Sequence, residues 1–229
     1  MSRKSNFKSR ICNSITLLLI WLISPDVTAN TTEKDSKRLL TSLHTQWAVV
    51  YYDLSGQDQL AAFEQLISKA DDIVASHPDQ PDLLIWRGII NATYAGAKRG
   101  RGALKYAETA RADLERAIGL DEDALQGAAY TTLGTLYYRL PGWPFAFGDD
   151  KKAERLLRKG LSVNPNGIES NYFYADFLMQ EGNIQEAEYY FRRALSAPLR
   201  HGKEKADRER RKQIQALLNR LKSSLLNTM

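Results

Sequence analysis

The chain of 229 residues carries one spaced pattern of small and large apolar residues twice near its C-terminal end. The first copy comprises Tyr130, Leu133, Gly134, Tyr137, Ala153, Leu157, Gly160 and Pro165. The second copy comprises Asn171, Tyr174, Ala175, Leu178, Ala187, Phe191 and Ala194, with Pro198 shortly after. Small residues at these positions let two antiparallel helices approach closely, and the large residues fill the space to the next helix pair. One pair cannot bury its own apolar face, so the pattern predicts helix pairs that stack on one another.

The rest of the chain shows helical periodicity, because its apolar residues recur at steps of three and four and no convincing strand pattern is present. We therefore expect an all-α fold, with antiparallel helix pairs stacked in a short solenoid. The predicted helices cover residues 33–54, 58–76, 82–95, 103–119, 124–140, 150–163, 168–181, 183–197 and 203–226. The last of them carries one apolar stripe, which is typical of a capping helix.

Residues 128–198, which hold both copies, resemble tetratricopeptide repeats. An earlier and weaker copy begins near Gly88, with about ten additional residues between its two helices. The resemblance implies a single domain over residues 30–229: a degenerate pair at 33–78, a weaker repeat at 82–119, a repeat with an inserted loop (141–150) at 124–165, a repeat at 168–198 and the cap at 203–226. It implies a binding surface and does not identify what is bound.

A narrower resemblance is to small exported proteins grouped with the T component of TRAP-type solute transporters. The segments that carry it are Trp86–Gly88, Tyr137–Tyr138, Pro141–Pro144, Phe147–Asp150 and Asn171–Tyr174. This resemblance implies a periplasmic helical-repeat protein that assists substrate capture.

The N-terminal 29 residues have the composition of a secretory signal peptide. Four basic residues precede a short apolar run at 15–23, and small residues follow up to Ala29. The run is much shorter than the roughly 20 residues that span a bilayer. We predict cleavage after Ala29 and export to the periplasm; the alternative is retention as an N-terminal anchor.

Removal of this segment changes what the composition implies. The segment holds Cys12, the one cysteine of the chain, so the mature chain would carry no thiol. It also carries four basic residues and one acid, so the net charge of +5 would fall to +2. A nucleic-acid partner is therefore not expected.

Catalysis finds little support in the sequence. His44, His77 and His201 are scattered without the spacing of metal ligands. No G-x-S-x-G motif is present, and a Cys/His pair is impossible in the mature chain. We expect a non-enzymatic protein without cofactor or metal.

The inserted loop 141–150 is the first candidate for a specific site. Its aromatic residues are costly to leave in water, because burial of each would contribute about 1.5–3 kcal/mol. One interpretation is a lid over a pocket with acids at its rim. The other is a plug that packs onto the solenoid, in which case the acids cap the following helix. The candidate residues are Trp143, Phe145, Phe147, Asp149 and Asp150.

The concave face of the array is the second candidate, because the first helix of each pair lines it. Repeat alignment places these residues there: Trp86, Ile89, Thr131, Thr135, Tyr138, Tyr172, Phe173 and Asp176. The Lys/Asn carboxylate clamp of some repeat proteins is missing at these positions. An aromatic groove would suit a protein segment or an apolar or aromatic small ligand; the alternative is that the aromatic residues belong to the core. The basic stretch from Arg200 to Lys222 could contact an anionic membrane surface, although such a pattern is more typical of the solvated side of a terminal helix.

Overall fold

The computed structural model describes residues 25–226, which form nine α-helices and one short 3-10 helix. The helices are α1 (Pro25–Asp53), α2 (Gly56–Ser76), α3 (Pro81–Lys98), η1 (Arg101–Ala103), α4 (Leu104–Leu120), α5 (Ala124–Arg139), α6 (Asp150–Val163), α7 (Ile168–Gln180), α8 (Ile184–Ser196) and α9 (Glu204–Leu226). This part of the chain contains no strand, which confirms the expected all-α class. No helix within it is long and apolar enough to span a membrane.

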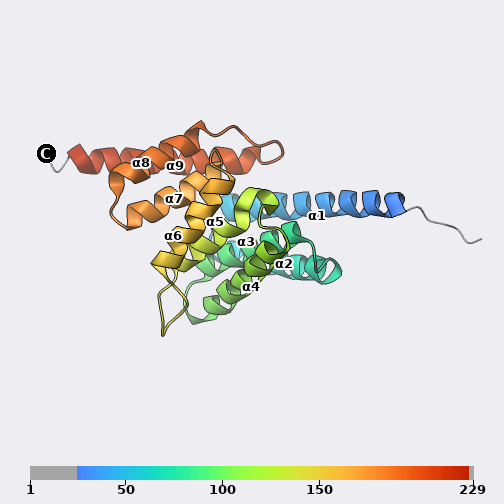
Figure 1. The fold of residues 1–229 in the computed structure, drawn as a ribbon. Helices are drawn as coiled ribbons and strands as arrows, with labels where there is room; N and C mark the ends of the chain where they lie inside the picture. Colours follow the sequence, from blue (N-terminus) through green and yellow to red (C-terminus); the bar gives the residue numbers. More distant parts are fainter. Residues whose placement is uncertain (1–24, 227–229) are drawn as a thin grey trace, which may run out of the picture.

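The helices form a stack of pairs in chain order (Figure 1). Helix α3 packs against α4, α5 against α6 and α7 against α8, and each pair also contacts the next. The core between them is continuous from Leu43 on α1 to Leu218 on α9. The expected stack of helix pairs with a C-terminal cap is therefore confirmed.

Glycines set the close approach of the helices within two of the pairs. A Cβ atom on Gly134 of α5 would lie 2.8 Å from Cγ of Leu157 on α6. A Cβ atom on Gly88 of α3 would lie 2.9 Å from Cγ of Leu114 on α4. Because the same glycine–leucine contact occurs in both pairs, the weaker copy that begins near Gly88 packs as the clearer copy does.

The last helix packs against the first one, so the two ends of the stack are in contact. Helix α9 contacts both α8 and α1, and Lys205 of α9 forms an ion pair with Asp53 at the end of α1. On its apolar face Ala206, Ile214 and Leu218 are buried, and Leu217 and Leu221 are half-buried. The stack is therefore closed on one side by a contact between its two ends.

Several helix boundaries differ from the expected ones. Helix α1 already begins at Pro25 and runs through Ala29, where cleavage is predicted, while residues 1–24 of the predicted signal peptide lie outside the described residues. Helix α3 continues past Gly96, and the chain breaks instead at Arg99 and Gly100, whose φ angles are 55° and 72°.

The first turn of α5 is left-handed, which periodicity cannot reveal. Leu125, Gln126 and Gly127 have φ angles of 47°, 58° and 71°. This conformation is uncommon for residues that carry a Cβ atom. The side chain of Gln126 accepts a hydrogen bond of 3.1 Å from Nδ2 of Asn164, which ties the turn to the end of α6.

Candidate functional site

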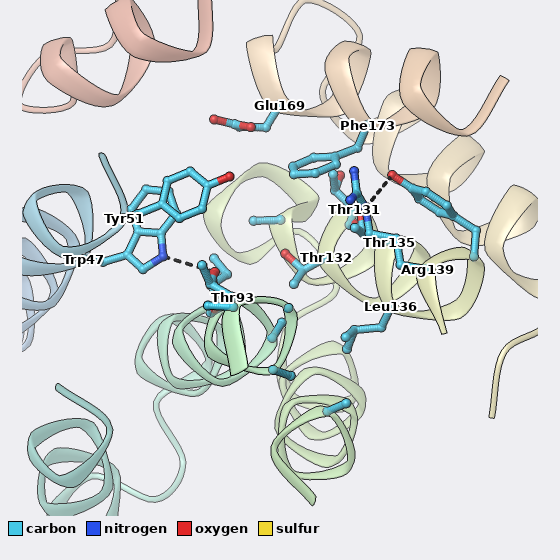
Figure 2. A pocket seen from close by; sticks show the side chains of 18 of the residues that line it. Trp47, Tyr51, Thr93, Thr131, Thr132, Thr135, Leu136, Arg139, Glu169 and Phe173 are labelled. Carbon is cyan, nitrogen blue, oxygen red and sulfur yellow. Dashed lines mark hydrogen bonds between the residues drawn. The ribbon is translucent and has the colours of Figure 1, made fainter. Parts of the chain in front are cut away.

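The first helices of the pairs surround a pocket of about 1460 Å³ on the concave side of the stack (Figure 2). Side chains of α1, α3, α5 and α7 line it, and the start of α9 with the segment before it closes it. The volume exceeds the roughly 300–1,000 Å³ of most small-ligand pockets. The pocket is therefore large enough for an extended segment of a second chain.

Aromatic side chains form two opposite walls of this pocket. Trp47 and Tyr51 of α1 stack with their ring centroids 5.1 Å apart, and Phe173 of α7 lies across the pocket from them (Figure 2). Tyr172 packs edge-on against Phe173 at 5.0 Å. These walls offer apolar contact area that is already ordered by packing.

Hydroxyl groups lie between the aromatic walls. Thr132 and Thr135 of α5 and Thr93 of α3 line the floor (Figure 2), and Thr131 also contacts the pocket although its hydroxyl lies against Gly160 of α6. Thr93 accepts a hydrogen bond of 3.1 Å from Nε1 of Trp47. A floor with hydroxyl groups can pair with the amide groups of a bound backbone, which an apolar floor cannot do.

Two extended connections form one rim of the pocket. In each helix pair, a small residue on the first helix and a large residue on the second occupy equivalent positions of the repeat. In the last pair these are Ala175 and Phe191, 16 positions apart in sequence. The equivalent residues are 23 positions apart in the pair with Gly134 and Leu157, and 26 apart in the pair with Gly88 and Leu114. Both longer pairs carry their additional residues between the first and the second helix. Residues from both connections reach the pocket: Arg99, Gly100, Ala103, Pro141, Phe145 and Ala146.

The inserted loop 141–150 protrudes between α5 and α6 (Figure 1), and two hydrogen bonds hold its base. The amide of Gly148 donates to the carbonyl oxygen of Pro141 at 3.0 Å, and the amide of Asp149 donates to that of Tyr137 at 3.0 Å. Phe147 packs edge-on against Tyr137 at 5.3 Å, under the guanidinium of Arg111. The base of the loop is therefore fixed to the stack.

The tip of the loop behaves differently from its base. Trp143 is 90% exposed and Phe145 is 76% exposed. Asp149 accepts a hydrogen bond of 2.9 Å from the amide of Lys152 and thereby caps α6, in whose first turn Asp150 lies. The loop is thus neither wholly a lid nor wholly a plug, because Phe147 packs onto the stack, Phe145 reaches the pocket rim and Trp143 faces solvent.

A buried hydrogen bond joins α5 to α7 behind the pocket wall. The hydroxyl of Tyr138 donates to Oδ2 of Asp176 at 2.5 Å, and the guanidinium of Arg139 lies 2.5 Å from the same oxygen. Burial, followed by the charge of Asp176, raises the pKa of Tyr138 above its usual value. Asp176 is therefore engaged within the fold and is not among the residues that line the pocket.

Charged residues gather where α7 meets the start of α9. Glu169 of α7 lies 3.4 Å from Arg200 and 3.1 Å from Arg210. The buried Asp207 also accepts a hydrogen bond of 2.7 Å from the amide of Arg200. Part of the basic stretch from Arg200 to Lys222 thus points into the pocket, so the interpretation of the stretch as the solvated side of a helix is wrong for Arg200 and Arg210.

The structure gathers some of the predicted site residues and separates others. Trp86, Ile89, Tyr138, Tyr172, Phe173 and Phe145 line the pocket, as do Thr131 and Thr135. Trp143, Phe147, Asp149, Asp150 and Asp176 do not. Trp47 and Tyr51 on α1 and Arg200, Lys203 and Arg210 near the C-terminus also line it and were not predicted. No repeat landmark marks them, because they are placed by the packing of α1 on α3 and of the C-terminal segment on α7 and α1.

His44 of α1 lies at the closed end of the pocket. Its ring packs edge-on against Trp86 with centroids 5.1 Å apart. Burial, followed by the positive charges of Lys203 and Arg200, lowers the pKa of His44 from 6.5 to about 4. The imidazole is therefore neutral at physiological pH. Within residues 25–226, no group of three histidine, cysteine or acidic side chains is arranged to hold a metal ion.

Comparisons with solved structures yield neighbours of low sequence identity. No protein-family model matches the sequence, and no curated protein matches it. A structure described as the crystal structure of MamA is 19% identical, covers 60% of this chain and 89% of its own, and superposes with a TM-score of 0.32. A second, described as the crystal structure of MamA protein, is 18% identical, covers 72% of this chain and 93% of its own, and has a TM-score of 0.31.

Proposed function

We propose that this chain is an exported, non-enzymatic binding protein whose concave pocket receives an extended segment of a partner protein. The observation that carries the proposal is the pocket itself, which combines ordered aromatic walls with a row of threonine hydroxyls. Aromatic side chains would hold alternate side chains of the segment, and the hydroxyls would pair with its backbone. The signal-peptide pattern of residues 1–29 supports export.

Site-specific cross-linking tests this proposal. A photo-reactive phenylalanine analogue is placed at Phe173, inside the pocket, or at Tyr189, which is exposed on α8. Both changes replace one aromatic ring by another, so the fold is disturbed little in either case. We expect a defined cross-linked partner from the Phe173 position and none from the Tyr189 position. The reverse pattern would show that the partner binds outside the pocket.

A second candidate function is that of a small-ligand-binding accessory in a solute transport system. The observation in its favour is that residues of α1 and of the start of α9 both line the pocket, so that it can surround much of a small molecule. Native mass spectrometry of the purified full chain separates the two functions. A retained molecule of a few hundred daltons, lost after Phe173→Ala, would favour the accessory; cross-linking of a protein segment at Phe173 would favour the partner-binding protein.

A further inference from the structure

Lys203 is a charged residue at the closed end of the pocket, by which we mean the end lined by His44, Trp86 and the start of α9. It lies just before α9, and its Nζ atom is 5.7 Å from the ring centroid of Trp86. Among the described residues, no carboxylate lies within ion-pair distance of this ammonium group. Burial, followed by the positive charge of Arg200, lowers the pKa of Lys203. A partly buried cation without an ion-pair partner is costly, so such an arrangement is favourable where a ligand supplies the counter-charge.

Glu169 and Asp207 do not supply it, because they are already paired with arginines. Glu169 lies between Arg200 and Arg210, and Asp207 is bound by Arg200. These acids, with Asp82 on α3, act on Lys203 only at longer range. The residues around Lys203 thus comprise three cations and three acids, and Lys203 and Asp82 are the two members of this group that form no ion pair with another described residue.

Two buried polar atoms beside Lys203 also lack partners within the described part of the chain. They are Nε1 of Trp86 and Nε2 of His44. The indole nitrogen can only donate a hydrogen bond, and a neutral imidazole donates from Nε2 in one of its tautomers. Buried polar atoms are nearly always satisfied in folded proteins, so these two atoms on adjacent rings are candidates to donate to a bound acceptor.

We propose that the closed end of the pocket is a carboxylate-binding site, with Lys203 as the ion-pair partner and Trp86 and His44 as neutral donors. A single ammonium group beside two neutral donors matches a monoanionic carboxylate better than a dianionic phosphate. The aromatic walls formed by Trp47, Tyr172 and Phe173 would accommodate the apolar part of the same ligand. The inference deepens the proposed function, because it assumes that the pocket is occupied by a bound chain or molecule.

The experiment compares ligands that differ only in this group. One arm uses a randomised decapeptide pool with free C-termini and the same pool with amidated C-termini. The other arm uses dodecanoate and dodecanamide. Binding to the full chain is quantified by mass spectrometry of the retained ligand for the unmodified protein, Lys203→Met, Lys203→Arg and Lys212→Met. Lys212 serves as the control because it lies exposed on α9 beside Glu209.

We expect one arm to show an acid-over-amide preference of about tenfold, the order of a charge-assisted hydrogen bond. The preference should be lost in Lys203→Met, and Lys203→Arg and Lys212→Met should keep it. The arm that shows the preference identifies the source as a peptide C-terminus or a free acid. Thermal unfolding of Lys203→Met should occur at or above the temperature of the unmodified chain, because an unpaired cation is removed.

Two outcomes would overturn the proposal in different ways. If acid and amide bind equally, or if Lys203→Met keeps the preference, the carboxylate site is wrong while the pocket remains a binding site. If neither member of either pair binds, and the Phe173 position yields no cross-linked partner, the proposed function fails together with the site.

Discussion

The hydroxyl of Tyr138 on α5 lies 2.5 Å from Oδ2 of Asp176 on α7, and both side chains are buried. This hydrogen bond joins two successive first helices at the back of the pocket. Tyr138→Phe leaves a buried carboxylate with one partner fewer, so we expect a loss of about 1–3 kcal/mol in the free energy of unfolding. Urea denaturation measures it, with Tyr189→Phe on the exposed face of α8 as the control. Equal transition midpoints for the two variants would show that the bond contributes nothing.

Glycine at position 134 is required by packing, whereas glycine at position 96 is not. A Cβ atom on Gly134 would lie 2.8 Å from Cγ of Leu157 and 3.2 Å from the carbonyl oxygen of Ala153, while one on Gly96 would meet nothing within 4 Å. Gly134→Ala should therefore destabilise the chain by about 1–3 kcal/mol. Gly96→Ala should stabilise it by up to about 1 kcal/mol, because alanine favours the helix. Denaturant unfolding of both variants checks the opposite signs, and the same sign for both would refute the packing argument.

The pKa of His44 makes stability depend on pH in the acid range. The folded chain holds this pKa at about 4, below the unfolded value of 6.5, so the unfolded chain binds more protons between these pH values. Stability from this group is therefore fully present above pH 6.5 and decreases as the pH falls towards 4, by up to about 3 kcal/mol.

His44→Gln should remove this part of the pH dependence. Thermal unfolding at a series of pH values between 4 and 7.5 measures it. The control is His201→Gln, at an exposed position, which should retain the slope of the unmodified chain. An unchanged slope in His44→Gln would contradict the burial of a neutral imidazole.

Two aromatic residues of the loop 141–150 should respond differently to truncation. Phe147 packs on Tyr137 under Arg111, so Phe147→Ala should cost about 1–2 kcal/mol of stability, less than a fully buried ring. Trp143 is 90% exposed, so Trp143→Ala should change stability by less than about 0.5 kcal/mol. Partner binding, measured by cross-linking from position 173, should decrease in Trp143→Ala. If neither stability nor cross-linking changes in that variant, the tip of the loop has no role in binding.

The fold could be predicted from sequence because its determinants are local. Each helix pair carries its small and large residues at fixed spacing, so Gly134 and Leu157 indicate their contact without knowledge of the rest. The same local signal placed Tyr138, Tyr172 and Phe173 on first helices. The left-handed turn at Leu125 and Gln126 could not be predicted in this way, because neither residue type favours positive φ.

The remainder of the pocket depends on contacts that no repeat spacing encodes. Trp47 and Lys203 are 156 positions apart; Trp47 reaches the pocket because α1 packs on α3, and Lys203 reaches it because α9 packs against α1. The sequence pattern identifies α9 as a capping helix, but it does not indicate which other helix this cap packs against. The exposure of Trp143 could not be predicted either, because an aromatic loop has the same composition whether it packs against the fold or protrudes into solvent.

The contact between α9 and α1 also bears on how the chain unfolds and responds to load. In an open array each terminal repeat contacts one neighbour only, so the terminal repeats unfold first. Such an array can also bend and stretch elastically. Here the first and last helices support each other, and Lys205 and Asp53 link them directly. Loss of either end removes a neighbour from the other, so fraying at the two termini is coupled.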